Sequence, residues 1–379
     1  MRALNLGILA HIDAGKTSLT ERLLFDAGVI DAMGSVDRGN TQTDTMALER
    51  QRGITIRSAV ASFVVNDVTI NLIDTPGHPD FIAEVERTLA CLDAVVLVVS
   101  AVEGVQAQTR VLMRTLQRLQ IPTLIFVNKI DRMGADPEGV VARIADKLTP
   151  AILPMQRVVT AGERGADVVT PGATEHAFVS KLAEALAEND AAVLEAVIAD
   201  RALPYADLQR SLAQQTGAGQ IHPIFFGSAM TGVGIASLMA GITGLLPVGQ
   251  GDAAAELSGI IFKIDRGPAG EKIAYVRLFS GVLHARERLQ YGNGHHEKVT
   301  AISMFDRGWK SGATCIAAGQ IGQIRGLVHA RVGDAIGANP RRRATALRPL
   351  PSKPGFRRNS PVTGPGYGWP SANWRNRIR

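Results

Sequence analysis

Residues 1–135 alternate short runs of apolar residues with a stretch in which apolar residues recur at helical spacing. The short runs predict buried strands, and the periodic stretch Lys16–Phe25 predicts a helix. Strands that alternate with helices form a mostly parallel sheet with helices on both faces, so the pattern predicts an α/β domain. The predicted strands are Leu6–Ala10, Ile70–Ile73, Ala94–Ser100 and Thr123–Val127.

The same domain continues through residues 138–220, which are rich in alanine and predict helices, including the periodic stretch Phe178–Ile198. A strand at Pro223–Phe226 and a helix at Gly234–Leu245 follow. We therefore expect the first domain to span residues 1–247, with a linker of Gly, Ala and acidic residues at 248–256.

From Leu257 short apolar runs are separated by Gly, Asp and Asn, which predicts a small antiparallel β-barrel over residues 257–337. The predicted strands are Ile260–Ile264, Ile273–Ser280, Glu297–Met304 and Gln320–Leu327.

The basic charge of the chain comes from its last segment. The chain holds 41 Lys and Arg against 35 Asp and Glu, but ten of the basic residues and no acidic residue lie in Pro340–Arg379. The preceding residues are therefore mildly acidic and show no broad nucleic-acid footprint. Seven prolines and the absence of any helix or strand period predict that residues 338–379 form a disordered tail.

The sequence disfavours a membrane protein and a protein whose cysteines bind a metal or act in redox chemistry. The longest apolar run, Ala94–Ala101, is far shorter than the ~20 residues of a membrane helix, so we expect no membrane partner. Cys91 and Cys315 have neither metal nor redox spacing, and we interpret both as packed thiols of a cytoplasmic protein.

The first candidate site segment joins a predicted strand to a predicted helix. At a helix N-terminus the backbone N–H groups of Asp13–Thr17 can cradle phosphates. Lys16 would neutralise the β- and γ-phosphate oxygens, and Thr17 would give its hydroxyl to Mg²⁺. Ala10 stands where such loops usually have glycine, whereas the glycine before the lysine is present. The segment is Ala10-His11-Ile12-Asp13-Ala14-Gly15-Lys16-Thr17.

The second segment, Asp74-Thr75-Pro76-Gly77-His78, follows a predicted strand. A carboxylate at Asp74 can hold Mg²⁺ directly or through water. Gly77 lets the backbone approach the γ-phosphate, and His78 could orient the attacking water, since phosphoryl transfer depends mainly on positioning. Taken alone, His78 would be an ordinary loop histidine.

The third segment, Asn128-Lys129-Ile130-Asp131, also follows a buried strand. The Asp131 carboxylate can accept hydrogen bonds from N1–H and N2–H of guanine, which adenine does not offer. Lys129 can lay its stem along the base and ribose. Ser228 and Ala229 would complete the base pocket with a backbone N–H. In isolation the segment would be an exposed polar turn.

Between the first two segments, the polar stretch Gly34–Ile56 is a candidate switch. Thr55 could reach Mg²⁺ when GTP is bound and release it after hydrolysis; the alternative is an ordinary mobile loop. Together the segments predict a P-loop GTPase that binds GTP, GDP and Mg²⁺, with Lys16, Thr55 and His78 as catalytic residues. The metal ligands would be Thr17, Thr55 and Asp74.

These segments resemble the translational GTPases, in particular the elongation factor G branch. Within that branch, further stretches resemble the ribosomal protection proteins that confer tetracycline resistance, over about residues 1–337. The stretch Arg52–Ile56 belongs to the resemblance to the elongation factor G branch. The additional stretches that narrow it are Gly34–Asp37, Thr43-Asp44, Leu48–Gly53 and Gly104–Arg110.

The resemblance implies a monomeric, cytoplasmic GTPase that binds the ribosome near its factor-binding site, releases tetracycline and hydrolyses GTP. It also implies that Thr55 binds Mg²⁺, that His78 orients water once the ribosome activates it, and that Ile12 and Ile54 form an apolar gate. The family has about three more domains after the barrel, so we expect impaired drug release. The alternatives are an elongation factor G-like translation factor, or a GTP-binding remnant without ribosomal activity.

The tail matches no element of that family and leaves two interpretations. We favour coding DNA read out of frame after about residue 339, because every acidic residue is lost at once. The alternative is a basic arm on ribosomal RNA, with Tyr367, Trp369 and Trp374 stacked on bases. Translation of the gene in another frame should restore an acidic, periodic continuation if the first interpretation is right.

Overall fold

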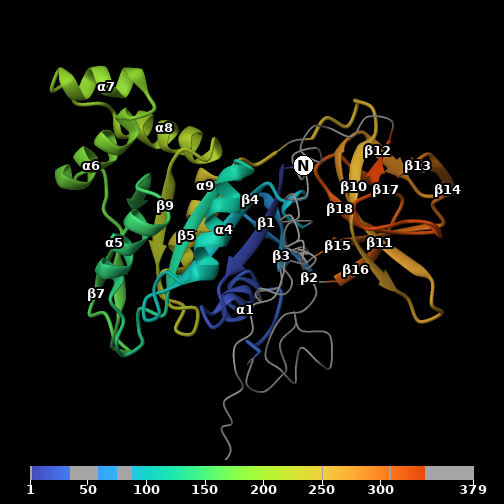
Figure 1. Cartoon of the computed structure of the whole chain (residues 1–379), viewed down its shortest axis with the longest axis horizontal. Coiled ribbons are helices and arrows are strands. Elements are labelled where there is room, and N and C mark those ends of the chain that lie inside the picture. Colours follow the sequence, from blue (N-terminus) through green and yellow to red (C-terminus); the bar gives the residue numbers. More distant parts are fainter. Residues whose placement is uncertain (1, 35–58, 75–87, 250, 307–308, 338–379) are drawn as a thin grey trace, which may run out of the picture.

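The structure is a computed structural model that describes residues 2–34, 59–74, 88–249, 251–306 and 309–337. A seven-stranded sheet has the order β2-β3-β1-β4-β5-β9-β6, and all of its pairings are parallel except that of β2 with β3 (Figure 1). The strands are β1 Arg2–Ala10, β2 Ala59–Val65, β3 Val68–Asp74, β4 Ala94–Ser100, β5 Thr123–Asn128, β6 Ile152–Pro154 and β9 His222–Phe226.

Helices cover both faces of this sheet, which confirms the predicted α/β fold. On one face Leu19 of α1 (Lys16–Asp26) and Leu238 of α9 (Ile235–Leu245) belong to one apolar core with Leu6 of β1. On the other face lie α4 (Ala107–Arg118) and α5 (Pro137–Lys147), whose apolar side chains share cores with β4 and β5. Loops therefore follow the carboxyl ends of the parallel strands, which is where ligands bind in sheets of this kind.

The segment between β5 and β9 differs in part from its predicted helical content. It contains β6 and the hairpin of β7 (Arg157–Val159) and β8 (Asp167–Val169) as well as helices. The helical stretch predicted at Phe178–Ile198 is split into two helices, because Asp190 caps a new one by accepting from the Ala192 and Val193 N–H groups at 3.1 and 3.3 Å. The helices are α6 His176–Ala187, α7 Ala191–Ile198 and α8 Tyr205–Gly217.

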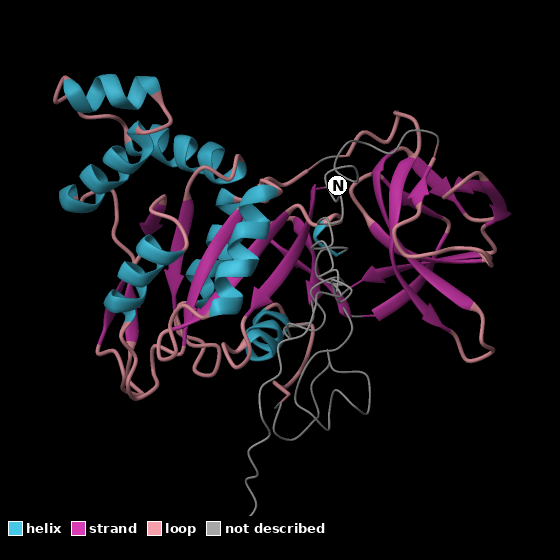
Figure 2. Ribbon diagram, viewed as in Figure 1, coloured by secondary structure: helices cyan, strands magenta, loops and turns pink. Residues whose placement is uncertain are grey.

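The predicted β-barrel is also confirmed. Antiparallel strands β10–β19 form an eight-stranded sheet and a two-stranded sheet that share one apolar core, which includes Ile261, Leu283 and Ile316 (Figure 2). The strands are β10 Ser258–Arg266, β11 Lys272–Ser280, β12 Val282–His284, β13 Arg288–Tyr291, β14 His295–Lys298, β15 Ala301–Asp306, β16 Trp309–Ala313, β17 Cys315–Ala317, β18 Ile321–Arg325 and β19 Ala335–Ile336.

One predicted strand of the barrel is wrong in its extent. Glu297–Met304 is not continuous, because the chain leaves β14 after Lys298 and enters β15 at Ala301. Between them the Val299 N–H bonds to the Glu287 carbonyl and the Thr300 N–H to the Arg325 carbonyl, so the partner strand changes from β13 to β18. The predicted domain limits at 247 and 257 stay predictions; α9 ends at Leu245 and β10 begins at Ser258.

A buried polar network joins the barrel to the first domain. Arg277 of β11 donates to the Cys91 carbonyl and, at 2.5 Å, to Oδ1 of Asp93. Oδ2 of Asp93 accepts from the backbone and side-chain N–H groups of Asn5 at 2.9 and 2.8 Å, and Asn5 Nδ2 also donates to the Gly319 carbonyl at 3.0 Å. Side chains of both domains surround this network in one apolar cluster, including Leu92 and Tyr275.

Arg277→Met is expected to lower the free energy of unfolding by about 3 kcal/mol, because it leaves the Asp93 carboxylate, which is only 16% exposed, without its cation. Urea denaturation of the variant would measure the loss. Arg288→Met, on the exposed side of β13, is the matched control and should cost less than about 0.5 kcal/mol. Equal losses of unfolding free energy in the two variants would contradict a stabilising role for the network. Asp93→Asn added to Arg277→Met should recover part of the lost free energy.

Candidate functional site

The loop between β1 and α1 has the backbone shape of an anion-binding site. Asp13 and Gly15 adopt left-handed conformations with φ of 64° and 92°, and α1 begins at the next residue. Left-handed residues that alternate with right-handed ones turn successive N–H groups toward one point, at the positive end of the helix. Lys16 is largely buried, and Thr17 is half-buried in the first turn. The backbone of this loop thus has a geometry that suits phosphate, and phosphate binding stays a prediction.

Asn128 links this loop to the other predicted parts of the pocket. It ends β5 and is buried. Its Nδ2 donates to the Ala14 carbonyl at 2.9 Å, and its Oδ1 accepts from the Ala229 N–H at 3.0 Å. The structure therefore brings together the first segment, the third segment and the Ser228-Ala229 loop, as the sequence analysis predicted.

The requirement for glycine at position 15 follows from the same side chain. A Cβ atom built on Gly15 would lie 2.3 Å from Asn128 Nδ2. Any larger residue would displace the amide that bridges Ala14 and Ala229, in addition to straining the left-handed backbone.

Arg22 of α1 holds the Ser228-Ala229 loop and was missed by the sequence analysis. Its Nε donates to the Ala229 carbonyl at 3.0 Å, and its Nη2 donates to the Met230 carbonyl at 2.7 Å. With these carbonyls fixed on α1, the Ala229 N–H is directed to Asn128. A single basic residue beside Leu23 and Leu24 in a predicted helix was the only sequence signal.

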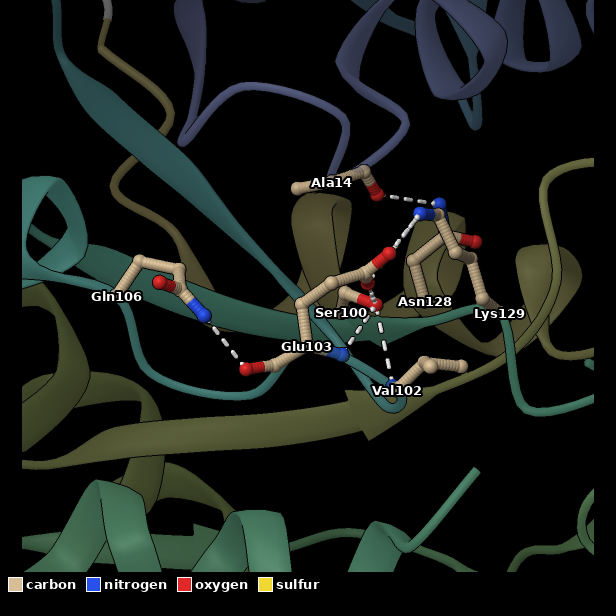
Figure 3. A network of polar contacts seen from close by, with 7 residues as sticks. All are labelled: Ala14, Ser100, Val102, Glu103, Gln106, Asn128 and Lys129. Atoms are coloured by element: carbon tan, nitrogen blue, oxygen red, sulfur yellow. Dashed lines mark hydrogen bonds and ion pairs between the residues drawn. The ribbon is translucent and has the colours of Figure 1, made fainter. Parts of the chain in front are cut away.

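Lys129 is held by a second residue that the sequence analysis missed. Its Nζ lies 3.0 and 3.3 Å from the two carboxylate oxygens of Glu103, which also meets the Ser100 hydroxyl (Figure 3). Burial opposes ionisation of Glu103, but the Lys129 ammonium and backbone N–H groups outweigh it and lower the pKa of the carboxyl. Lys129 itself has φ of 66°, an uncommon conformation for a residue with a side chain.

His11 is a buried member of the phosphate loop. Its Nδ1 lies 3.1 Å from the Thr109 hydroxyl of α4. Burial lowers the pKa of His11, and the Lys129 charge adds to the effect, while Glu103 and Asp13 oppose it. The imidazole is therefore neutral near pH 7, and its described contact is with α4.

Some of the remaining predicted residues lie in the described part of the chain, and the others lie outside it. Ile130 is buried with its N–H on the Gly227 carbonyl, whereas Asp131 is half-exposed and Ile12 is exposed. Asp74 ends β3, where it pairs with Ile8 of β1, two residues before the start of the first segment at Ala10. The positions outside the described residues are Ile54, Thr55, Thr75, Pro76, Gly77, His78 and the tail 338–379.

The described loops fit a nucleotide better than an all-carboxylate metal site. Within the described ranges, no group of three or more His, Cys, Asp or Glu could hold a metal ion. A hydroxyl at the first turn of a helix, such as that of Thr17, could supply a single oxygen ligand to a divalent ion. In the same described ranges, no helix is long and apolar enough to cross a bilayer.

Comparisons with known proteins agree with this geometry. Residues 1–248 match the family model of the elongation factor Tu GTP binding domain. The chain belongs to this family, and membership implies guanine nucleotide binding and GTP hydrolysis.

The relatives are tetracycline resistance proteins, which confirms the resemblance predicted from sequence. The chain is 52% identical over 347 residues to the oxytetracycline resistance protein of Streptomyces rimosus, covering 89% of the chain and 52% of the relative. It is 47% identical over 360 residues to the tetracycline resistance protein TetM of Streptomyces lividans, covering 92% and 55%. The chain therefore spans about half the length of the curated relatives that it matches.

A solved structure supports the fold across both domains. The crystal structure of a protein from Thermus thermophilus matches with a TM-score of 0.80 at 23% identity, covering 92% of this chain and 56% of that one.

Proposed function

We propose that the chain is a ribosome-dependent GTPase of the tetracycline ribosomal protection type. The observation that carries the proposal is the bridge of Asn128 between Ala14 and Ala229, which joins a phosphate-binding loop to a base-binding loop. The tetracycline resistance named in the relatives supports the cellular role.

In this proposal the base binds between Lys129, Asp131 and the backbone of Ser228-Ala229. The Asp131 carboxylate accepts from the two guanine N–H donors, and a base without them leaves that carboxylate unpaired. Partial exposure of Asp131 in the structure is consistent with a side chain that faces a ligand.

The phosphates bind at the loop from Ala10 to Thr17. Backbone N–H groups and the Lys16 ammonium stabilise the negative charge that the β- and γ-phosphate oxygens carry during hydrolysis. Mg²⁺ would be held by Thr17, Asp74 and Thr55, and it would supply further charge neutralisation of the phosphates. His78 would orient the attacking water. The ribosome is the proposed partner, and we propose a cytoplasmic monomer.

Three measurements on the purified chain test this proposal. Fluorescent GDP should bind with Mg²⁺ present, and 70S ribosomes should raise the rate of phosphate release from GTP. Ribosome-bound radiolabelled tetracycline should be released in the presence of GTP, but to a smaller extent than by the S. rimosus relative, in line with the impaired release expected from the sequence. The S. rimosus relative, which is about twice as long, is the positive control.

The pattern of results separates the candidate functions. Stimulation by ribosomes without any release of tetracycline would favour an elongation factor G-like translation factor. GDP binding without ribosomal stimulation would identify a GTP-binding remnant, and failure to bind GDP would overturn the proposal entirely.

A further inference from the structure

The turn between β4 and α4 fixes the position of one carboxylate from several sides. The turn starts at Ser100, the last residue of β4, whose hydroxyl accepts from the Val102 and Glu103 N–H groups at 3.1 and 3.3 Å. The same hydroxyl donates to the Glu103 carboxylate. Gln106 Nε2 donates to the Glu103 carbonyl at 2.7 Å, so both the backbone and the side chain of Glu103 are held (Figure 3).

This fixed carboxylate meets the residue that follows Asn128. Both oxygens of Glu103 lie within hydrogen-bonding distance of Lys129 Nζ, and the Lys129 side chain is only 14% exposed. Figure 3 shows the Lys129 side chain directed at Glu103, beside the Ala14 carbonyl that Asn128 contacts. Glu103 is thus placed to determine where the Lys129 chain lies.

The same turn also contacts the phosphate side of the pocket. Thr109 and Gln106 form a capping box at the start of α4, and the Gln106 N–H bonds to the Thr109 hydroxyl at 3.3 Å. That hydroxyl is also the partner of His11 in the phosphate loop. One short segment therefore supports His11 on one side and Lys129 on the other.

We propose that Glu103 is a positioning residue for the guanine base, acting by holding Lys129 in its binding arrangement before nucleotide arrives; this inference rests on the proposed function. A free lysine chain loses much rotational freedom when it is ordered against a ligand, and a chain that is already held loses less. The proposal also gives a role to Gln106 of the stretch Gly104–Arg110, which holds the backbone of Glu103 through its carbonyl.

The alternative is that the pair is an ordinary surface ion pair, which contributes little. The two interpretations differ in what Glu103 does to nucleotide binding. An ordinary pair leaves nucleotide kinetics unchanged when broken, whereas a positioning residue changes them through Lys129 alone.

The test is the dissociation rate of fluorescent GDP from the full chain with Mg²⁺, measured by stopped flow. Glu103→Gln is expected to speed dissociation about 10-fold, with the association rate little changed. Glu103→Asp keeps the charge, so its dissociation rate should lie between that of the unaltered chain and that of Glu103→Gln. Glu138→Gln is the matched control, because Glu138 is exposed in the first turn of α5 and the substitution removes the same charge.

A double-mutant cycle with Lys129→Met distinguishes positioning from a general structural effect. If Glu103 acts through Lys129, the double variant should release GDP at the rate of Lys129→Met alone. Multiplying effects in the double variant, or a rate for Glu103→Gln equal to that of the unaltered chain, would overturn the inference while leaving GTP binding intact. Failure of the unaltered chain to bind GDP would overturn the proposed function and this inference with it.

Discussion

Asp131→Asn is expected to lower the affinity for GDP by about 100-fold or more and to favour xanthosine diphosphate. The carboxylate would lose two charge-assisted hydrogen bonds to guanine, each worth about 1.5–3 kcal/mol. An asparagine side chain can accept from N1–H of xanthine with its carbonyl oxygen, and it can donate from its NH₂ group to the carbonyl that xanthine carries where guanine has its amino group. The variant therefore should exchange its base preference instead of losing nucleotide binding altogether.

Competition of GDP and xanthosine diphosphate against fluorescent GDP would measure both affinities. Asp146→Asn, an exposed substitution on α5 that removes the same charge, is the control and should leave both affinities unchanged. Unchanged GDP affinity in Asp131→Asn would remove Asp131 from the base pocket.

Gly15→Ala is expected to reduce nucleotide affinity by about 100-fold and to destabilise the first domain. The added methyl group would lie 2.3 Å from Asn128 Nδ2, so the amide must move. Its displacement leaves the Ala14 carbonyl and the Ala229 N–H without their partner, and each loss costs about 1–3 kcal/mol when the group is buried. The loop that contains Ala14 and the loop that contains Ala229 would then no longer be held at a fixed distance from each other.

Gly28→Ala separates this clash from simple backbone strain. Gly28 also has a left-handed φ, of 68°, but no atom lies within 4 Å of the position that a Cβ would take there. It should show the strain of about 1 kcal/mol in thermal unfolding, with normal nucleotide affinity. Similar affinity losses in both glycine variants would show that the position of Asn128 is not what Gly15 protects.

Much of the fold was predictable because the apolar runs are long and clean. The strand Ala94–Ser100 was predicted with its observed bounds, and α1 within one residue. The errors fall where a helix cap or a change of strand partner interrupts a regular pattern. Asp190 caps a new helix within a continuous helical period, and the pairing change at Val299-Thr300 lies within a run that reads as one strand.

The candidate site divides in a similar way. Its loops have characteristic residues at fixed spacing, so Gly15, Lys16, Asn128 and Asp131 could be selected from sequence. Arg22 and Glu103 could not, because their partners lie 207 and 26 positions away along the chain, and nothing local marks such contacts.

The sequence by itself determined the class of fold and the three loop segments, because strand periodicity and glycine placement are local properties of the chain. The tertiary structure decided which side chains hold those loops together. Asn128 of the third segment bonds to the first segment and to the Ser228-Ala229 loop, and Arg22 holds that loop. Arg277 joins the barrel to the first domain. Such contacts depend on parallel strands meeting at one edge and on two cores packing together, which only the folded chain establishes.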